Sequence, residues 1–429
     1  MGQTPPKHKS IADWKELASA SPEAAACAYS DSLKAIPEEA KRRVFAALPS
    51  HDELVEAFAV SKSQAIRPLA GVPFLLKDLY DFPGYPTTAS SSFLTEVRPP
   101  SESESALSMD LRTQGAVFAG KTHLNEFAYG LSGENLTFGD CPHPVFPDRL
   151  SGGSSSGSAW AVRSGIAPLA TGTDTAGSIR VPSAWCGLWG IRFAPNKWST
   201  EGCFPLAPKF DTAGWMTATS EDMAIAINAL LVPRRTSSSE PKGLNLIGAV
   251  SNLTPSFRIR SADILDRLNL SSESDALDAY YRDTKDSPFS YAVLQSRDAF
   301  QVHREWLDEY KERYDPVVWA RLDRARHWSD EQVKKAIQAE EATKGFFARC
   351  FESYDFIVLP ATQSPAIKAT EHTDTFRNEL LAITAPASVA RTPVLTIPIH
   401  LDNGASQGLQ ILYRDGESDL PLRLIETLS

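Results

Sequence analysis

A stretch rich in serine and glycine, residues 151–187, carries the side chains with the clearest chemical potential. It reads SGGSSSGSAWAVRSGIAPLATGTDTAGSIRVPSAWCG and contains two Ser/Gly turns separated by an Ala-rich and an apolar segment. Each turn presents a serine, Ser154 and Ser178, that packing alone does not require. A serine hydroxyl is a poor nucleophile at neutral pH unless a base lies within hydrogen-bond reach. The two turns therefore predict a nucleophilic site, provided that the chain supplies that base.

Lys77 is the candidate base. It follows the apolar run Phe74–Leu76 in the segment GVPFLLKD, and burial at such a position lowers the pKa of a lysine toward neutrality. The eight histidines are scattered, and none lies in a strong motif. Two other interpretations of Lys77 remain open at this point. Its amine could reach water at the end of a strand, or it could pair with Asp78.

The backbone around the serines is expected to be tightly folded. Glycines at 152, 153 and 157 allow a close turn at Ser154. We expect a short helix over 158–164 and a strand over 167–171. The turn that follows would project Ser178 and align the N–H groups of residues 175–178 as an oxyanion hole. Two alternatives remain. In the first, the sequence forms a G-x-S-x-G elbow in which Ser155 is the nucleophile and a downstream acid and histidine complete the site. In the second, the stretch is a flexible linker, which its regular apolar flanks disfavour.

The elements that must position these residues alternate between helix and strand. Helices are predicted over Trp14–Ala20, Pro22–Ala35, Pro37–Ala47, Ser103–Gln114 and Met223–Leu231, the last of them capped by Ser220. A long charged helical segment is predicted over Asp298–Tyr354, and another helix is expected to start at Pro182. Strands are predicted over Phe74–Lys77, Ala116–Ala119, Leu244–Val250, Tyr291–Leu294, Phe356–Pro360, Pro393–Pro398 and Gly408–Leu412. This alternation predicts an α/β fold.

The pattern favours one domain overall. The first seventy residues (1–70) are expected to form a helical segment packed on a core that comprises 71–429. A surface loop is expected over Pro233–Gly243. It is short, and a strand pattern resumes after it, so we do not expect a domain boundary there.

Composition narrows the function class. The formal net charge is −10, which argues against nucleic acid or an anionic membrane as the partner. The five cysteines are widely spaced without a zinc pattern, so free thiols and no metal are expected. Cys186 lies among the serines and is an alternative nucleophile. The N-terminus MGQTPPKHKS has no apolar leader, and no run is long enough to span a membrane, which predicts a cytoplasmic protein.

The motifs resemble those of the amidase signature family. The family patterns appear here as GVPFLLKD (71–78), GGSSSGSA (152–159) and GTDTAGSIRVP (172–182), and the resemblance extends through GKTHLNEFAYGLSGEN (120–135), PLAPKFDTAGWM (205–216) and YDFIVLPA (354–361). The resemblance implies a large mixed β-sheet covered by α-helices. It also implies a hydrolase that cleaves a small amide to an acid and ammonia or an amine, without metal or cofactor.

The resemblance also implies residue roles. Ser178 would be the nucleophile, Ser154, preceded by a cis peptide, the proton bridge, and Lys77 the base. The oxyanion would be held by the N–H groups of Thr175, Ala176, Gly177 and Ser178. Asp174 and Arg180 flank the turn and are expected to support it.

Three positions depart from the family pattern. Ser156 and Ala176 each stand where a glycine is expected, and Gly190–Asn196 replaces the usual GxKPTxG. Ala176 would narrow the oxyanion turn if that position needs a positive φ.

The chain looks most like small indole-3-acetamide hydrolases, so an aryl or indolyl acetamide is the expected substrate. An aromatic acyl pocket is one interpretation of Trp160, Trp185, Trp189, Trp198 and Trp215, but tryptophans at such positions are more often core. The alternatives are an amidotransferase-type subunit that releases ammonia from glutamine for a partner, and a non-enzymatic adaptor, disfavoured because all three site residues are present. A homodimer is a further expectation.

Overall fold

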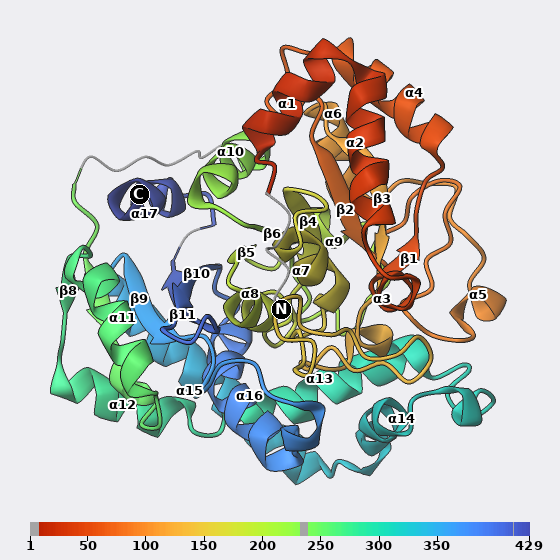
Figure 1. Ribbon diagram of the computed structural model, residues 1–429. Coiled ribbons are helices and arrows are strands. Elements are labelled where there is room, and N and C mark those ends of the chain that lie inside the picture. Colours follow the sequence, from red (N-terminus) through yellow and green to blue (C-terminus); the bar gives the residue numbers. More distant parts are fainter. Residues whose placement is uncertain (1–7, 232–238, 415) are drawn as a thin grey trace.

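The computed structural model describes residues 8–231, 239–414 and 416–429. Over these residues, eleven strands form one mixed sheet in the order β1-β3-β2-β4-β6-β5-β10-β11-β9-β7-β8, with helices packed around it (Figure 1). The α/β class and the large mixed sheet predicted from the sequence are therefore confirmed.

The strands are short and mostly buried. They are β1 (Phe45–Ala47), β2 (Pro73–Lys77), β3 (Val117–Thr122), β4 (Leu169–Thr173), β5 (Trp189–Arg192), β6 (Ala213–Thr217), β7 (Gly243–Asn245), β8 (Leu270–Ser271), β9 (Phe356–Pro360), β10 (Val394–His400) and β11 (Ser406–Tyr413). The α-helices are α1 (Ile11–Ala20), α2 (Pro22–Lys34), α3 (Glu38–Val44), α4 (His51–Lys62), α5 (Leu94–Val97), α6 (Ala106–Thr113), α7 (Ser156–Arg163), α8 (Arg180–Cys186), α9 (Lys197–Thr200), α10 (Ser220–Leu230), α11 (Pro255–Asp266), α12 (Ser274–Thr284), α13 (Ser287–His303), α14 (Pro316–Asp323), α15 (Asp330–Ser353), α16 (Asp374–Val389) and α17 (Leu420–Leu428).

The centre of the sheet brings the predicted base next to the serine turns. Strand β2 runs parallel to both β3 and β4. Because the carboxyl ends of parallel strands meet at the same edge of a sheet, Lys77 at the end of β2 and Thr173 at the end of β4 lie side by side. The Ser178 turn begins directly after Thr173.

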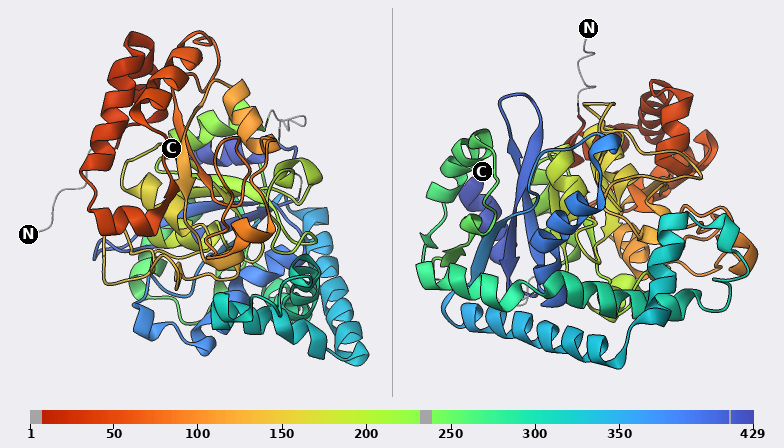
Figure 2. Two further views of the ribbon diagram at one scale, coloured as in Figure 1. Left: turned by 90° about the vertical axis from the view of Figure 1, so that its right-hand side faces the viewer. Right: turned by 90° about the horizontal axis from the view of Figure 1, so that it is seen from below.

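The helices that carry or face the serine turns pack directly on this sheet. Helix α7 begins just after Ser154 and contacts β4, while α8 begins just after Ser178 and contacts β10 and β11. The long helices α13 and α15 run side by side along one face of the molecule (Figure 2), and α16 packs against α13. The N-terminal helices α1, α2 and α4 pack on one another beside β3.

Several predicted elements were wrong in type or extent. Residues 291–294, expected as a strand, lie inside α13, because a four-residue apolar run cannot distinguish a buried strand from one face of a helix. The helix predicted over 37–47 ends at Val44, and β1 follows. The strand predicted over 244–250 is only β7 (Gly243–Asn245), followed by a 3₁₀ turn.

The remaining differences concern helix ends. Helix α10 is capped by Thr219 rather than by Ser220, since the Thr219 hydroxyl accepts from the N–H of Asp222. The charged segment 298–354 is divided among the end of α13, α14 and α15. The loop predicted at 233–243 falls largely on residues 232–238, which lie outside the described residues. The division of the chain at residue 70 stays a prediction, although β1 from the first segment joins the sheet of the second.

Candidate active site

Lys77 is fully buried at the end of β2, and its amine contacts the first serine turn. Its Nζ lies 2.8 Å from Ser154 Oγ and 2.8 Å from Thr173 Oγ1. Its backbone N–H donates to Thr171 Oγ1 at 3.1 Å, which fixes the strand end. Burial lowers the pKa of Lys77 to about 7, even though Asp174 and Asp211 oppose that shift. A neutral amine is therefore well populated near neutral pH.

The two other interpretations of Lys77 do not describe this structure. Asp78 pairs with Lys121, with the Lys121 Nζ and Asp78 Oδ1 atoms 2.7 Å apart and both side chains buried. Lys77 has no exposed surface, so its amine does not reach water. The carboxylate of Asp78 also accepts from the N–H of Thr88.

The Ser154 turn is packed against the loop that follows β3. The Gly153–Ser154 peptide is cis, as the resemblance implied, and Ser154 is fully buried. The carbonyl of Ser154 accepts from the N–H of Asn125 at 3.3 Å. A Cβ at Gly153 would lie 2.0 Å from Asn125 Oδ1, so only glycine fits this close approach.

Ser178 lies on the second turn, beside the first. Its carbonyl accepts from the N–H of Ser155 at 3.2 Å, which ties the two turns together. Its hydroxyl makes no hydrogen bond to any residue that the structure describes. Within the same described residues, the N–H groups of Thr175, Ala176, Gly177 and Ser178 donate to no protein acceptor. Such unsatisfied donors on one turn can bind an oxyanion.

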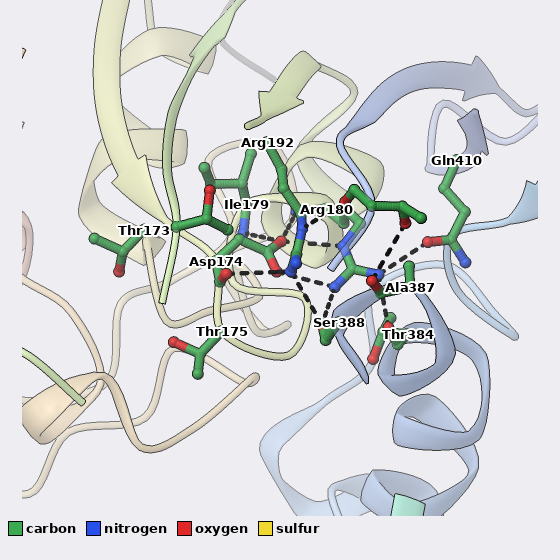
Figure 3. A network of polar contacts seen from close by, with 12 residues as sticks. Thr173, Asp174, Thr175, Ile179, Arg180, Arg192, Thr384, Ala387, Ser388 and Gln410 are labelled. Atoms are coloured by element: carbon green, nitrogen blue, oxygen red, sulfur yellow. Dashed lines mark hydrogen bonds and ion pairs between the residues drawn. The ribbon is translucent and has the colours of Figure 1, made fainter. Parts of the chain in front are cut away.

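Asp174 holds the residues on either side of Ser178 through hydrogen bonds to the backbone of Ile179 and to two arginines (Figure 3). Its Oδ2 accepts from the N–H of Ile179 and from Arg180 Nε, and its Oδ1 accepts from Arg180 Nη2 and Arg192 Nη1 at 2.9 and 2.8 Å. Burial raises the pKa of Asp174, but the two guanidinium groups outweigh burial and hold that pKa well below its usual range. We call Asp174, Arg180 and Arg192 the Asp174 cluster. Both arginines also donate to Ser388 Oγ of α16.

A second carboxylate fixes the start of the turn. Thr175 Oγ1 donates to Asp211 Oδ1 at 2.7 Å, and Asp211 Oδ2 accepts from the N–H groups of Leu206 and Ala207 at 2.9 Å each. Asp211 lies in the FDTAGW segment. Its role and that of Thr173 were not predicted, although both residues fall inside motifs that the sequence offered.

The departures from the family pattern are accommodated. Ala176 does not have a positive φ, because Gly177 takes that conformation with a φ of 139°, so the expected narrowing does not arise. Ser156 opens α7 and is buried. Arg192, within the replaced GxKPTxG segment, contributes a cation to the Asp174 cluster.

Ser178 opens into a small pocket whose far wall comes from distant parts of the chain. Thr175 and Ala176 line it on the side of the turn. Three more distant residues also line it: Tyr129, which follows β3, Tyr291 of α13 and Arg377 of α16. A larger cavity is also lined by Tyr129 and Arg377, so it adjoins this pocket. Tyr129 falls inside the segment 120–135 that carries the family resemblance, whereas no sequence motif indicated Tyr291 or Arg377, and none of the three was predicted to line the pocket.

The alternative nucleophiles are engaged elsewhere. Ser155 is buried, and its hydroxyl donates to the carbonyl of Thr173 at 3.3 Å. Cys186 Sγ contacts the carbonyl of Ser151 at 3.2 Å, and burial raises the pKa of its thiol. Buried histidines pair away from the turns, as His123 does with Ser90 Oγ and His303 with Tyr314 Oη.

Other sequence expectations have mixed outcomes. All five cysteines are free. Trp160, Trp185 and Trp215 are core residues and do not line the Ser178 pocket. Among the described residues, one group of potential metal ligands was not foreseen: atoms of Glu23, Cys27 and His51, on the surface of α2 and α4, lie within 4.8 Å of one another. In the described part of the chain, no helix is long and apolar enough to cross a membrane.

Comparisons with known proteins identify the family of this chain. A family model described as Amidase matches residues 28–259 and 264–417. The chain is similar to "Amidase 1" of Oryza sativa subsp. japonica, 27% identical over 395 residues that cover 84% of this chain and 90% of that protein. It is also similar to a glutamyl-tRNA(Gln) amidotransferase subunit of Halalkalibacterium halodurans, 30% identical over 430 residues and 87% of each chain.

A solved structure described as a crystal structure of amidase has the same fold. It superposes with a TM-score of 0.84 and 26% identity, covering 98% of this chain and 99% of that one. The family model spans most of the chain, including both serine turns and Lys77. The chain therefore belongs to the amidase family and is an amidase, a hydrolase of amide carbon–nitrogen bonds.

Proposed function

We propose that Lys77, Ser154 and Ser178 act as a relay that hydrolyses a small carboxylic amide to an acid and ammonia or an amine. The observation that carries this proposal is the 2.8 Å contact between Lys77 Nζ and Ser154 Oγ, made by a fully buried lysine. Its pKa of about 7 lets the amine accept a proton near neutral pH. The relay calls for no metal or cofactor.

Acylation begins with neutral Lys77. It takes a proton from Ser154, which takes the proton of Ser178 as Ser178 Oγ attacks the amide carbon. The new carbon–oxygen bond places negative charge on the carbonyl oxygen. The N–H groups of Thr175, Ala176, Gly177 and Ser178 are free to bind that oxyanion.

The relay then runs in reverse. The proton passes from Lys77 through Ser154 to the leaving nitrogen, the carbon–nitrogen bond breaks, and ammonia or an amine departs. Water attacks the acyl-Ser178 ester and gives its proton to the relay. Collapse of the second tetrahedral intermediate releases the acid and returns the proton to Ser178.

Removing the nucleophile tests this scheme. The Ser178→Ala variant should lose ammonia release from a panel of primary amides, and hydroxylamine should trap an acyl group on the wild-type protein alone. Ser155→Ala is the matched control, because within the described residues that hydroxyl donates its hydrogen bond to the carbonyl of Thr173 and none to Lys77 or Ser178. It should retain most of the activity. Wild-type rates in Ser178→Ala, or loss only in Ser155→Ala, would overturn the assignment.

Two narrower sequence predictions remain proposals. An aryl or indolyl acetamide is one candidate substrate, and the aromatic residues that would meet its ring are Tyr129 and Tyr291 rather than the buried tryptophans. The other is an amidotransferase-type subunit that releases ammonia from glutamine, which the similarity to amidotransferase subunits favours. Strict glutamine dependence and a stoichiometric partner in purified complexes would support the second. The homodimer and the cytoplasmic location stay predictions.

A further inference from the structure

One arginine of the Ser178 pocket, Arg377, lies near two others, Arg321 and Arg324. Arg377 lines both the small pocket and the larger cavity, and Arg321 lines the cavity. Arg324 contacts the Tyr129 hydroxyl at 3.5 Å, and Arg321 donates to the Tyr129 carbonyl. We call Arg321, Arg324 and Arg377 the Arg377 cluster. It gathers positive charge in a protein whose formal net charge is −10.

Arg377 has no hydrogen-bond or ion-pair partner among the described residues. Its guanidinium makes no hydrogen bond or ion pair with any residue in the described part of the chain, and its Nε is buried without an acceptor. Burial, together with repulsion by Arg321 and Arg324, lowers the pKa of Arg377 to about 10, so the group is still a cation at neutral pH. A cation held among like charges without a counter-ion destabilises the empty pocket.

Two of the five acids that line the cavity, Glu134 and Glu126, have partners of their own. Glu134 contacts His372, with 2.6 Å between Glu134 Oε2 and His372 Nδ1. Glu126 accepts from the N–H of Asp315 at 2.7 Å, and burial raises the pKa of Glu126 to about 8, which favours its neutral form. None of them neutralises Arg377.

Helix α16 sets the separation between this cation and the reacting atoms. Thr384 contacts the Ser178 turn, since its side chain lies 3.1 Å from where a Cβ on Gly177 would be. Arg377 precedes Thr384 by two helical turns, about 10 Å along the axis. Arg377 and Ser178 nevertheless line the same small pocket. Because both residues line one small pocket, a short ligand can contact them at the same time.

We propose that the preferred substrate carries a carboxylate on its acyl group, bound by Arg377, so that the enzyme cleaves the monoamides of short dicarboxylic acids. The inference rests on the proposed role of Ser178. A guanidinium can bind a carboxylate through two parallel, charge-assisted hydrogen bonds. The hydroxyl of Tyr291, which makes no hydrogen bond to a described residue, is a further donor in the pocket. A neutral aryl acetamide would leave the Arg377 charge uncompensated.

Isosteric substrate pairs test the proposal. Succinamate and glutaramate each have a neutral counterpart of equal size, succinamide and glutaramide, in which an amide replaces the carboxylate. Initial rates of ammonia release give kcat/KM for each. The wild-type protein should prefer the acid of each pair by about 10–100-fold, the value of a hydrogen bond to a charged group.

Variants assign that preference to Arg377. Arg377→Gln should lower kcat/KM for succinamate by about 10–100-fold, and by at least ten times more than for succinamide. Arg377→Lys keeps the positive charge but cannot form two parallel hydrogen bonds, so its kcat/KM for succinamate should lie between the values of the wild-type protein and Arg377→Gln. Arg258→Gln is the matched control, since Arg258 lies on α11 and donates to the carbonyl of Ser251. It should change neither rate.

A binding measurement separates this inference from the proposed function. Succinamate should raise the melting temperature of Ser178→Ala, and this shift should vanish when Arg377→Gln is added. Equal rates with acid and neutral amides, or equal losses in Arg377→Gln, would overturn the carboxylate preference while leaving Ser178 as the nucleophile. Hydrolysis that persists in Ser178→Ala would overturn the proposed function, and the binding shift would still decide the role of Arg377.

Discussion

Two groups of arginines lie near the Ser178 turn, and they differ in what surrounds them. In the Asp174 cluster, Arg180 and Arg192 share one carboxylate, and every partner in Figure 3 comes from the protein itself. In the Arg377 cluster, the structure provides no carboxylate within ion-pair distance, as far as its described residues extend.

This difference distinguishes a cluster that supports the catalytic turn from one that can recognise a substrate. A buried cation with a complete set of partners holds its neighbours in one geometry, and the Asp174 cluster does this for the turn that carries Ser178. A cation without partners stabilises nothing until a ligand arrives. Arginine therefore supports the reacting turn in the Asp174 cluster and, in the proposal above, selects the substrate in the Arg377 cluster. Variants of the two sides should differ in selectivity, stability and pH dependence.

The largest effect is expected from Lys77→Met. Loss of the base should lower kcat by about 10²–10⁴-fold, and equally for acid and neutral amides, because Lys77 contacts the serine relay rather than the wall. In the wild-type protein, activity should rise with pH through about 7, since the neutral amine is the active form and protonation below that pH removes it. The rate of ammonia release across pH 5–9 measures both the loss of kcat in the variant and the pH dependence of the wild-type protein. An activity that does not fall as the pH drops below about 7 would contradict the role of Lys77 as the base.

Asp174→Ala should come next. It would leave two buried guanidinium groups without their carboxylate, which costs about 3–5 kcal/mol of unfolding free energy. Urea denaturation measures this change. Asp402→Ala is the matched control because its pair with Arg260 is exposed, and it should lose less than about 1 kcal/mol. Equal losses in the two variants would mean that the Asp174 cluster does not hold the turn.

A smaller effect is expected from Thr175→Val. This variant removes the hydrogen bond between the oxyanion turn and Asp211 while nearly preserving side-chain volume. We expect kcat to fall about tenfold, equivalent to about 1.4 kcal/mol of transition-state stabilisation, with the same factor for acid and neutral amides. A loss confined to acid amides would assign Thr175 to recognition instead.

The smallest change is expected in the stability of Arg377→Met. Replacing an unpaired, largely buried cation with an apolar side chain should alter the unfolding free energy by less than about 1 kcal/mol or increase it. Urea denaturation of Arg377→Met and Asp174→Ala under the same conditions compares their unfolding free energies directly. A loss as large as that of Asp174→Ala would show that Arg377 has a partner in the folded protein, and the distinction between the clusters would fail.

The sequence was most informative where local pattern and chemistry coincide. An apolar run ending in Lys77 predicted a buried strand, and β2 is that strand. Glycines marked both serine turns because close approaches such as that of Gly153 to Asn125 exclude any side chain. Short apolar runs were less informative, and residues 291–294 belong to α13 rather than to a strand.

The pocket wall could not be predicted, for a physical reason. Arg377 lies about two hundred residues beyond Ser178, in the charged first half of a helix whose second half is apolar and buried, and no motif marks it. Its lack of a partner depends on how α13, α14 and α16 pack, which local pattern does not specify. Asp211 and Arg192 are intermediate cases: their segments were visible, but their partners required the folded chain.

Strand β1 has a consequence for any attempt to trim the protein. It covers the outer side of β3, which in turn pairs with the strand that ends at Lys77. A chain shortened to begin at Gly71 would leave the backbone of β3 open to pairing with other molecules, and such uncovered strands promote aggregation. Residue 70 therefore divides the sequence but not the sheet. A solubility tag or a split-protein junction belongs elsewhere.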